Sequence, residues 1–163
     1  MEKNLNLFCY GSNSVKQLKE RLEIEENISF QKAYIKNYVR IFCGFSKRWN
    51  GSVSSIYPLK GKNVYGILVK INIEDLEKIS KFEKGYHLEI KDININEKKT
   101  VKSFLFIKDD IKFNNIPSNE YMIAINTMLN DRNNNIKNRK IFIRGIIDNK
   151  IKIVSIWKNI FYN

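Results

Sequence analysis

The sequence predicts an α+β fold in which strands dominate the middle of the chain and a few helices flank them. An apolar run near the start ends in a tight polar turn and leads into a helical pattern. Between residues 29 and 71 apolar and polar side chains alternate, which is typical of strands. Helical spacing of apolar residues returns in only two later segments, near 72–85 and 119–129.

The length and composition predict one globular domain over residues 1–163. A chain of 163 residues with 43% hydrophobic side chains is long enough for one sizeable core. No apolar run approaches the roughly 20 residues that a membrane helix needs, and the first residues lack the apolar segment of a secretory signal. We therefore expect a soluble cytoplasmic protein with no membrane partner.

The net charge of +12, from 29 Lys and Arg against 17 Asp and Glu, would attract polyanions. The basic residues are mostly Lys and are spread along the chain, whereas nucleic-acid readers favour Arg interleaved with exposed aromatics. A basic scaffold for nucleic acid is therefore disfavoured. Cys9, Cys43 and His87 supply too few soft ligands for a zinc site, so we expect no metal.

The amino-terminal unit is predicted to be a strand at 5–10, a polar turn at 11–13 and a helix at 15–24. Any of residues 12–14 could cap the helix. Backbone N–H groups at such a turn stabilise carboxylates and developing oxyanions, and Gly11 would let a ligand approach closely. From the spacing alone, an ordinary capped turn is the simpler interpretation.

Further strands are predicted at 29–45, in two runs between 51 and 71, at 86–95, at 100–107, and in a final hairpin at about 141–157. Turn signals lie at Asn50-Gly51 and at 60–63, around the two middle runs. Trp49 before the first of these turns could form a pocket wall or simply anchor the turn. The sequence does not decide between these interpretations.

Two helices complete the predicted fold. The segment "NIEDLEKISKFEKG" has Asn72 as its N-cap, Asp75 as the capping-box partner and Gly85 as its stop. The second helix begins at "PSNE" and ends in the polar run 131–138, which is the best loop candidate. It carries Tyr121, whose hydroxyl could meet a ligand, although core packing is the commoner use of a tyrosine.

Glu83 is the candidate for proton transfer. It follows Leu76 and Ile79 at helical spacing, which places its carboxylate on the stripe that faces the core. A desolvated carboxylate near the negative end of a helix favours its protonated form, which suits a group that shuttles a proton near neutral pH. A glutamate at the rim, paired with a lysine, accounts for the same position equally well.

Four motifs in order resemble those of the gamma-glutamylcyclotransferase family, and the match runs through most of the chain. "FCYGSNS" resembles the family's YGSN loop, and "WNGSVSSIYPLKGKNVYGILVKI" resembles its segment that starts with W-x-G-G. "INIEDLEKISKFEKG" resembles its helix that ends in an acidic residue before Gly, and "PSNEY" its P-S-x-x-Y. Four ordered motifs are much more specific than any one of them.

The resemblance implies a β-barrel-like sheet that encloses a cavity, with no metal or organic cofactor. It also implies an acyltransferase or lyase of glutathione metabolism, which converts a small gamma-glutamyl amide to 5-oxoproline and a free amino acid or amine. Glu83 would be the general base and then the general acid. The substrate would be bound by the backbone of Leu7, Phe8, Cys9, Tyr10, Gly11 and Ser12 and by the hydroxyl of Tyr121.

Some features depart from the family pattern. The loop reads YGSN, rather than the YGSL of the glutathione-specific branch or the YGTL of the gamma-glutamylamine branch. Phe104 replaces a tyrosine that is frequent in active members, and the hairpin near 141–157 replaces an expected helix and tail. The alternative is a non-catalytic module that binds gamma-glutamyl or amino-acid-like ligands on the same fold. A homodimer also remains open.

Overall fold

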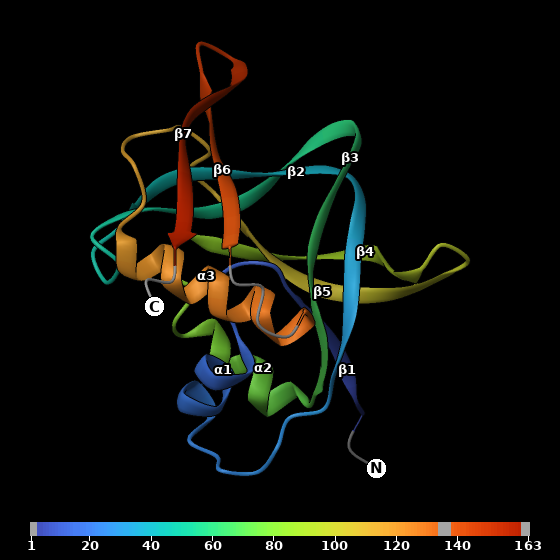
Figure 1. Cartoon of the computed structure of the whole chain (residues 1–163). Coiled ribbons are helices and arrows are strands. Elements are labelled where there is room, and N and C mark those ends of the chain that lie inside the picture. Colours follow the sequence, from blue (N-terminus) through green and yellow to red (C-terminus); the bar gives the residue numbers. More distant parts are fainter. Residues whose placement is uncertain (1–2, 134–137, 161–163) are drawn as a thin grey trace.

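The computed structural model of the chain describes residues 3–133 and 138–160, which form a closed five-stranded barrel, a separate hairpin and three helices (Figure 1). The barrel order is β1-β3-β2-β4-β5, and β1 closes it by lying antiparallel to β3 and parallel to β5. The barrel strands are β1 (Leu5–Cys9), β2 (Phe30–Ser46), β3 (Gly51–Ile71), β4 (Tyr86–Asn96) and β5 (Lys99–Lys108). The predicted α+β class with a barrel-like sheet is confirmed.

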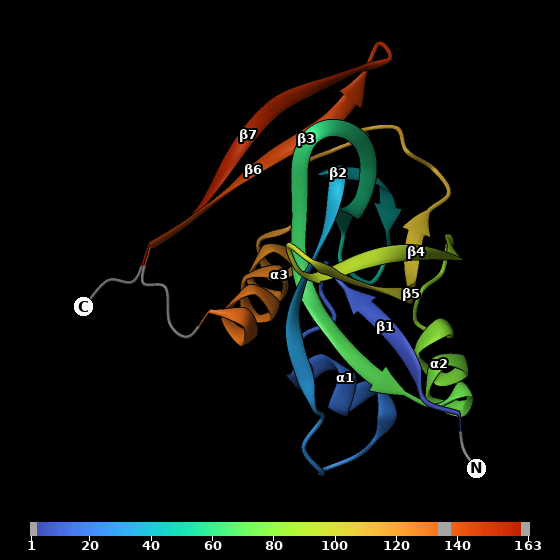
Figure 2. The same ribbon diagram turned by 90° about the vertical axis from the view of Figure 1, so that its right-hand side faces the viewer.

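The two runs predicted between residues 51 and 71 are one continuous strand, β3. The turn signal at 60–63 marks a bulge, because Lys36 pairs with Asn63 whereas Tyr38 pairs with Pro58. The N–H of Gly61 donates to Oδ1 of Asn37 across this bulge at 3.0 Å. The prediction of two strands was wrong here because a long barrel strand absorbs extra residues as a bulge without ending. Figure 2 shows β3 curving over the upper end of the barrel.

Alternate side chains of β1 enter two different parts of the core. Phe8 packs among barrel residues such as Leu68, Ile93 and Leu105. Leu7 lies on the opposite face of the strand, in the cluster that the barrel forms with α1 (Val15–Leu22) and α2 (Ile73–Ser80). Burial on both faces fixes where β1 ends relative to these two helices.

The caps of the first two helices follow from their sequences. Ser14 is the N-cap of α1, and its Oγ accepts a hydrogen bond from the N–H of Gln17 at 3.1 Å. The predicted capping box between Asn72 and Asp75 is confirmed in α2. The predicted stop at Gly85 was wrong, because α2 already ends at Ser80 and Gly85 lies in the turn before β4 with φ of 77°.

The third helix, α3 (Asn119–Arg132), carries the carboxyl-terminal hairpin of β6 (Asn138–Ile147) and β7 (Lys150–Ile160) on one side. Asp148 and Asn149 both have positive φ, which is the geometry of a two-residue hairpin turn. Trp157 of β7 donates from Nε1 to Oδ1 of Asn119 at 3.0 Å. In Figure 1 the helices gather around one end of the barrel and the hairpin projects beyond the other.

Part of the predicted polar loop at 131–138 lies outside the described residues, and α3 extends into its beginning. Within the described ranges, every helix is too short or too polar to cross a lipid bilayer.

Candidate active site

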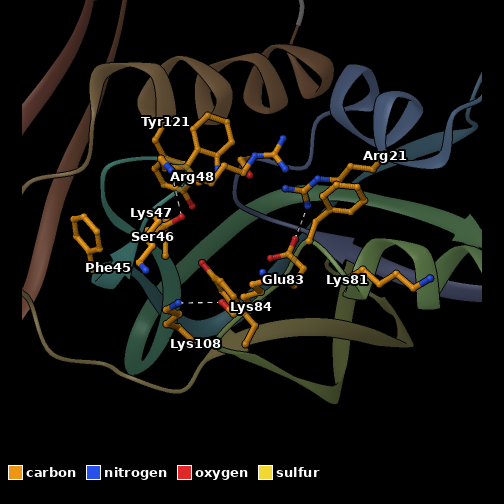
Figure 3. Close-up of a pocket in the computed structure, with 15 residues that line it drawn as sticks. Arg21, Phe45, Ser46, Lys47, Arg48, Lys81, Glu83, Lys84, Lys108 and Tyr121 are labelled. Atoms are coloured by element: carbon orange, nitrogen blue, oxygen red, sulfur yellow. Dashed lines mark hydrogen bonds and ion pairs between the residues drawn. The ribbon is translucent and has the colours of Figure 1, made fainter.

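Two adjoining pockets open where β1 ends, beside the turn between α2 and β4. The inner pocket has a volume of about 30 Å³ and the outer pocket about 480 Å³. The two share a wall made of Ser12, Glu83, Tyr86 and Tyr121. The chain segment 8–13 lines the inner pocket, and mainly basic and aromatic side chains line the outer one (Figure 3). A ligand that occupied both pockets would pass directly over Glu83.

Most of the amino-terminal segment that was predicted to bind the substrate lines the inner pocket. Residues Phe8, Cys9, Tyr10, Gly11 and Ser12 line it, whereas Leu7 is buried on the other face of β1 and does not. A methyl group on Gly11 would lie 2.7 Å from Oγ of Ser54, so only glycine lets the turn approach β3 this closely.

The first-turn amides of α1 already have acceptors within the protein. The N–H of Val15 donates to Oδ2 of Asp131 at 2.8 Å, and that of Gln17 donates to the N-cap. Within the described ranges, the N–H groups of Gly11 and Ser12 donate to no acceptor. The N–H groups open to an anion therefore belong to the turn that precedes the helix.

Glu83 lies beyond α2, in the turn that leads to β4, and not on the helical stripe from which it was predicted. Successive turns carry the chain there, because Phe82 N–H donates to the carbonyl of Ile79 and Glu83 N–H to that of Ser80, at 3.0 and 3.1 Å. The carboxylate is only 12% exposed. The side chain lines both pockets, so the prediction that it faces inward is confirmed. A tight turn directs it there, and not the face of a helix.

Arg21 and Asn13 hold the Glu83 carboxylate by one oxygen. Nη1 of Arg21 donates to Oε1 at 2.8 Å, and Nδ2 of Asn13 donates to the same oxygen at 2.9 Å. The same Arg21 nitrogen also donates to Oδ1 of Asn13 at 2.7 Å, which closes a three-membered network. Within the described residues no group donates to Oε2, so this oxygen remains available to a ligand. Figure 3 shows Arg21 reaching from α1 to the carboxylate.

Sequence reasoning missed Arg21 and Asn13 as site residues, although both left a signal. Arg21 follows Leu18 by three positions and so shares its buried helix face, where a cation needs a partner. Asn13 is the last residue of the YGSN loop, and it was considered only as a cap. The side chain of Arg21 is 3% exposed, and Glu83 is its only carboxylate partner in the described residues.

Tyr121 lies at the start of α3, and its hydroxyl is joined to β3. It accepts a hydrogen bond from the N–H of Ser54 at 2.8 Å and donates to Oγ of Ser54 at 2.9 Å. Tyr86 donates to the carbonyl oxygen of Ser54 at 2.8 Å. Burial raises the pKa of Tyr121 and that of Tyr86, so both phenols keep their protons at neutral pH. One lone pair of the Tyr121 oxygen is left for a ligand.

We expect Tyr121→Phe to lower the free energy of unfolding by about 1–3 kcal/mol, because the buried N–H of Ser54 loses its acceptor. Urea denaturation measures this difference. Tyr57→Phe is the matched control, since the hydroxyl of Tyr57 has no hydrogen-bond partner in the described residues and its loss should cost less than about 0.5 kcal/mol. Equal effects of the two substitutions would contradict the assigned network.

Other residues singled out in the sequence take structural places near the site. Trp49 is both a wall of the outer pocket and an anchor, since its ring packs edge-on against Tyr121 with centroids 5.2 Å apart. Phe104 pairs with Leu7 in the barrel and lines neither pocket. Cys9 and Cys43 are buried, and burial raises the pKa of both thiols. They therefore act as packed side chains and not as nucleophiles.

The family of the chain follows from its match to a family model. Residues 7–122, which include β1, Glu83 and Tyr121, match the family described as gamma-glutamyl cyclotransferase, AIG2-like. The chain belongs to this family. The matched segment of the cyclotransferase family ends just after the start of α3, so the β6–β7 hairpin lies outside it. Curated protein sequences give no match.

Solved structures share the cyclotransferase fold. A structure named gamma-glutamyl cyclotransferase has a TM-score of 0.68 and 18% identity, with 81% of this chain and 82% of that one covered. An uncharacterised protein from Homo sapiens gives 0.68 and 20%, with 83% of each chain covered. A glutathione-specific cyclotransferase from yeast gives 0.54 and 12%, with 82% and 90% covered. Identities this low establish the fold alone.

Metal ligands do not gather anywhere in residues 3–133 and 138–160, where no group of three or more His, Cys, Asp or Glu side chains could hold an ion. His87 lies on the exposed part of β4 and bonds to Glu89 and Asp109. It does not line either pocket described above.

Proposed function

We propose that the protein is a gamma-glutamylcyclotransferase, which converts a gamma-glutamyl amide to 5-oxoproline and releases an amino acid or amine. The observation that carries this proposal is the Glu83 carboxylate, which lines both pockets and is held by Arg21 and Asn13 through Oε1 alone. The reaction needs one group that first takes a proton from an ammonium and then gives it to a leaving nitrogen. Glu83 is the only carboxylate that lines either pocket in the described chain.

The α-carboxylate end of the gamma-glutamyl unit would enter the inner pocket and accept hydrogen bonds from the turn N–H groups of Gly11 and Ser12. These N–H groups have no other acceptor in the described residues, and glycine allows close approach. The leaving amino acid would extend into the outer pocket. The Tyr121 hydroxyl, with one lone pair free, would accept a hydrogen bond from the substrate ammonium or amide.

In the proposed reaction, Oε2 of Glu83 takes a proton from the α-ammonium. The freed amine nitrogen attacks the side-chain amide carbon of the same molecule, and its electron pair moves the carbonyl π electrons onto oxygen. The tetrahedral intermediate collapses as Glu83 returns the proton to the leaving nitrogen and the bond to that nitrogen breaks. The new ring nitrogen loses its second proton to the regenerated Glu83 carboxylate, and the released amine takes up this proton as an ammonium ion. Because both reacting groups belong to one molecule, the pocket accelerates the step mainly by holding it folded.

Arg21 supports both halves of this cycle as a positioning residue. Its hydrogen bonds to Asn13 and to Oε1 of Glu83 fix the carboxylate and leave Oε2 free for the substrate. The ammonium proton reaches a carboxylate that does not have to reorient. Such preorganisation is the usual source of catalytic advantage in a closed site.

The proposal is tested by 5-oxoproline release from gamma-glutamyl-alanine, glutathione and gamma-glutamyl-ε-lysine, followed by chromatography. We expect the purified protein to release 5-oxoproline and the free amino acid in equal amounts from at least one of these amides. Thermal stabilisation by the same compounds without any release would contradict the proposal and indicate a binding module instead.

A further inference from the structure

The outer pocket is strongly cationic, because basic side chains line most of it and Glu83 is its only carboxylate. Arg21 is already paired with that carboxylate. The other basic side chains in the lining are Lys47, Arg48, Lys81, Lys84 and Lys108. None of these five forms an ion pair with any carboxylate in residues 3–133 and 138–160. The leaving part of a substrate in this pocket would therefore meet several unneutralised cations.

Lys108, at the end of β5, gives the strongest indication of an anionic ligand, because it is buried. The residue is 7% exposed, and its ammonium donates only to the carbonyl oxygen of Lys84, at 3.2 Å. It also lies 4.8 Å from the ring centroid of Tyr86. An ammonium has three donors, so two are left over for a ligand in the pocket that Lys108 lines. A buried cation without an anion is costly, and an anionic ligand would remove that cost.

Two glycines lie close against the side chain of Lys108. A methyl group on Gly85 would lie 2.7 Å from Nζ of Lys108, and one on Gly44 would lie 2.7 Å from its Cε. Both glycines have positive φ, which other residues rarely adopt. Gly44 in β2 and Gly85 before β4 therefore leave room beside the Lys108 stem, and Figure 3 shows the Lys108 side chain among the residues that line the pocket.

Arg48 provides a second cation on the β2–β3 side of the pocket. Its guanidinium lies over the rings of Trp49 and Phe82, at 5.5 and 5.6 Å from their centroids. Aromatic stacking restrains the planar guanidinium, which leaves its edge free for a carboxylate in a bidentate arrangement. The labelled side chains in Figure 3 place Arg48 and Lys108 on opposite sides of the opening that leads to Glu83.

From these observations we infer that the outer pocket is a subsite for an acidic leaving residue, bound between Lys108 and Arg48. The substrate class is then a gamma-glutamyl peptide whose second residue carries a free side-chain carboxylate, such as gamma-glutamyl-glutamate. This inference rests on the proposed function, because it assigns the inner pocket to the gamma-glutamyl unit. The volume of about 480 Å³ accommodates one such residue.

The test compares gamma-glutamyl-glutamate with gamma-glutamyl-glutamine, which differ only in a carboxylate and an amide of nearly equal size. We expect kcat/KM for 5-oxoproline release to be at least about tenfold higher for gamma-glutamyl-glutamate, since partly buried opposite charges attract strongly. We also expect this preference to shrink as salt screens the charges at the mouth of the pocket.

Variants assign the preference to residues. Lys108→Met keeps the length of the stem and should bring the ratio of the two kcat/KM values close to one. Lys102→Met is the matched control on the same strand, because Lys102 is exposed and paired with Asp92 outside the pocket. If Lys108→Met does not fold, Arg48→Met tests the second cation, which lies on an exposed turn and should lower the same ratio.

The possible outcomes distinguish failure of the acidic subsite from failure of the proposed cyclotransferase activity. Equal kcat/KM for the two peptides in the unchanged protein would overturn the acidic subsite and leave the cyclotransferase proposal standing. A preference that persists in both Lys108→Met and Arg48→Met would also overturn it. Absence of 5-oxoproline from every gamma-glutamyl peptide would overturn the proposed function, and the subsite with it.

Discussion

Replacement of Glu83 by glutamine should lower kcat/KM for 5-oxoproline release by about 10²- to 10⁴-fold, the usual contribution of a general acid–base group. Glutamine keeps an oxygen that can accept hydrogen bonds from Arg21 and Asn13, so the geometry of the network survives. It cannot take a proton from the substrate ammonium at neutral pH. The loss should therefore appear in kcat, with a smaller change in KM.

The control for this substitution is Glu77→Gln, an exposed position on α2 that changes the net charge by the same amount. We expect its kcat/KM to stay within about twofold of the unchanged protein, because surface substitutions away from special contacts have small effects. Thermal unfolding of both variants verifies that they are folded. A Glu83→Gln protein with activity close to that of Glu77→Gln would rule out the proposed proton transfer.

Gly66→Ala should lower the free energy of unfolding more than a glycine-to-alanine substitution at any other glycine of the barrel. The new Cβ would lie 2.2 Å from the carbonyl oxygen of Cys9 and 2.8 Å from Cε2 of Phe8. The carbonyl belongs to backbone at the end of β1, so it cannot rotate away as a flexible side chain would. We expect the free energy of unfolding to fall by at least about 3 kcal/mol, at the upper end of overpacking effects.

Gly61→Ala on the same strand separates this contact from the general effect of replacing glycine. Gly61 has no atom within 4 Å of the added carbon but has φ of 84°, so alanine there pays only for its backbone conformation, about 1 kcal/mol. Urea midpoints of the two variants give the comparison. If Gly66→Ala were no less stable than Gly61→Ala, the close approach of β3 to β1 would be wrong.

Local patterns predicted the parts of the fold that depend on local physics. The capping box of Asn72 and Asp75 and the start of a helix at "PSNE" were readable because the caps bond within three residues. Alternation predicted strands between residues 29 and 71, and a short apolar run predicted β1, which is buried on both faces. The alternation could not show that β3 continues through residues 60–63, because a bulge and a turn use the same glycine-rich sequence.

The candidate site was predicted less completely, because its contacts join segments far apart in the sequence. Glu83 was selected from a helical spacing that the structure replaces with a turn after Ser80. Lys108 carried no local signal, since its burial depends on Lys84 and Tyr86, which pairing across the sheet brings beside it. Substrate binding by the backbone of Leu7 stays a prediction from the family resemblance, because its side chain packs on the face of β1 away from the pockets.

The three-membered network has a consequence for how the protein would lose activity. Arg21 belongs to α1, Asn13 to the loop before it, and Glu83 to the turn after α2, so none of the three is part of the barrel. Small peripheral helices open at lower free energy than a closed sheet. Mild denaturant would release α1 first and free the carboxylate to swing, while the barrel still gave the circular dichroism of folded protein. Catalysis would then report the docking of one eight-residue helix, and not the integrity of the whole fold.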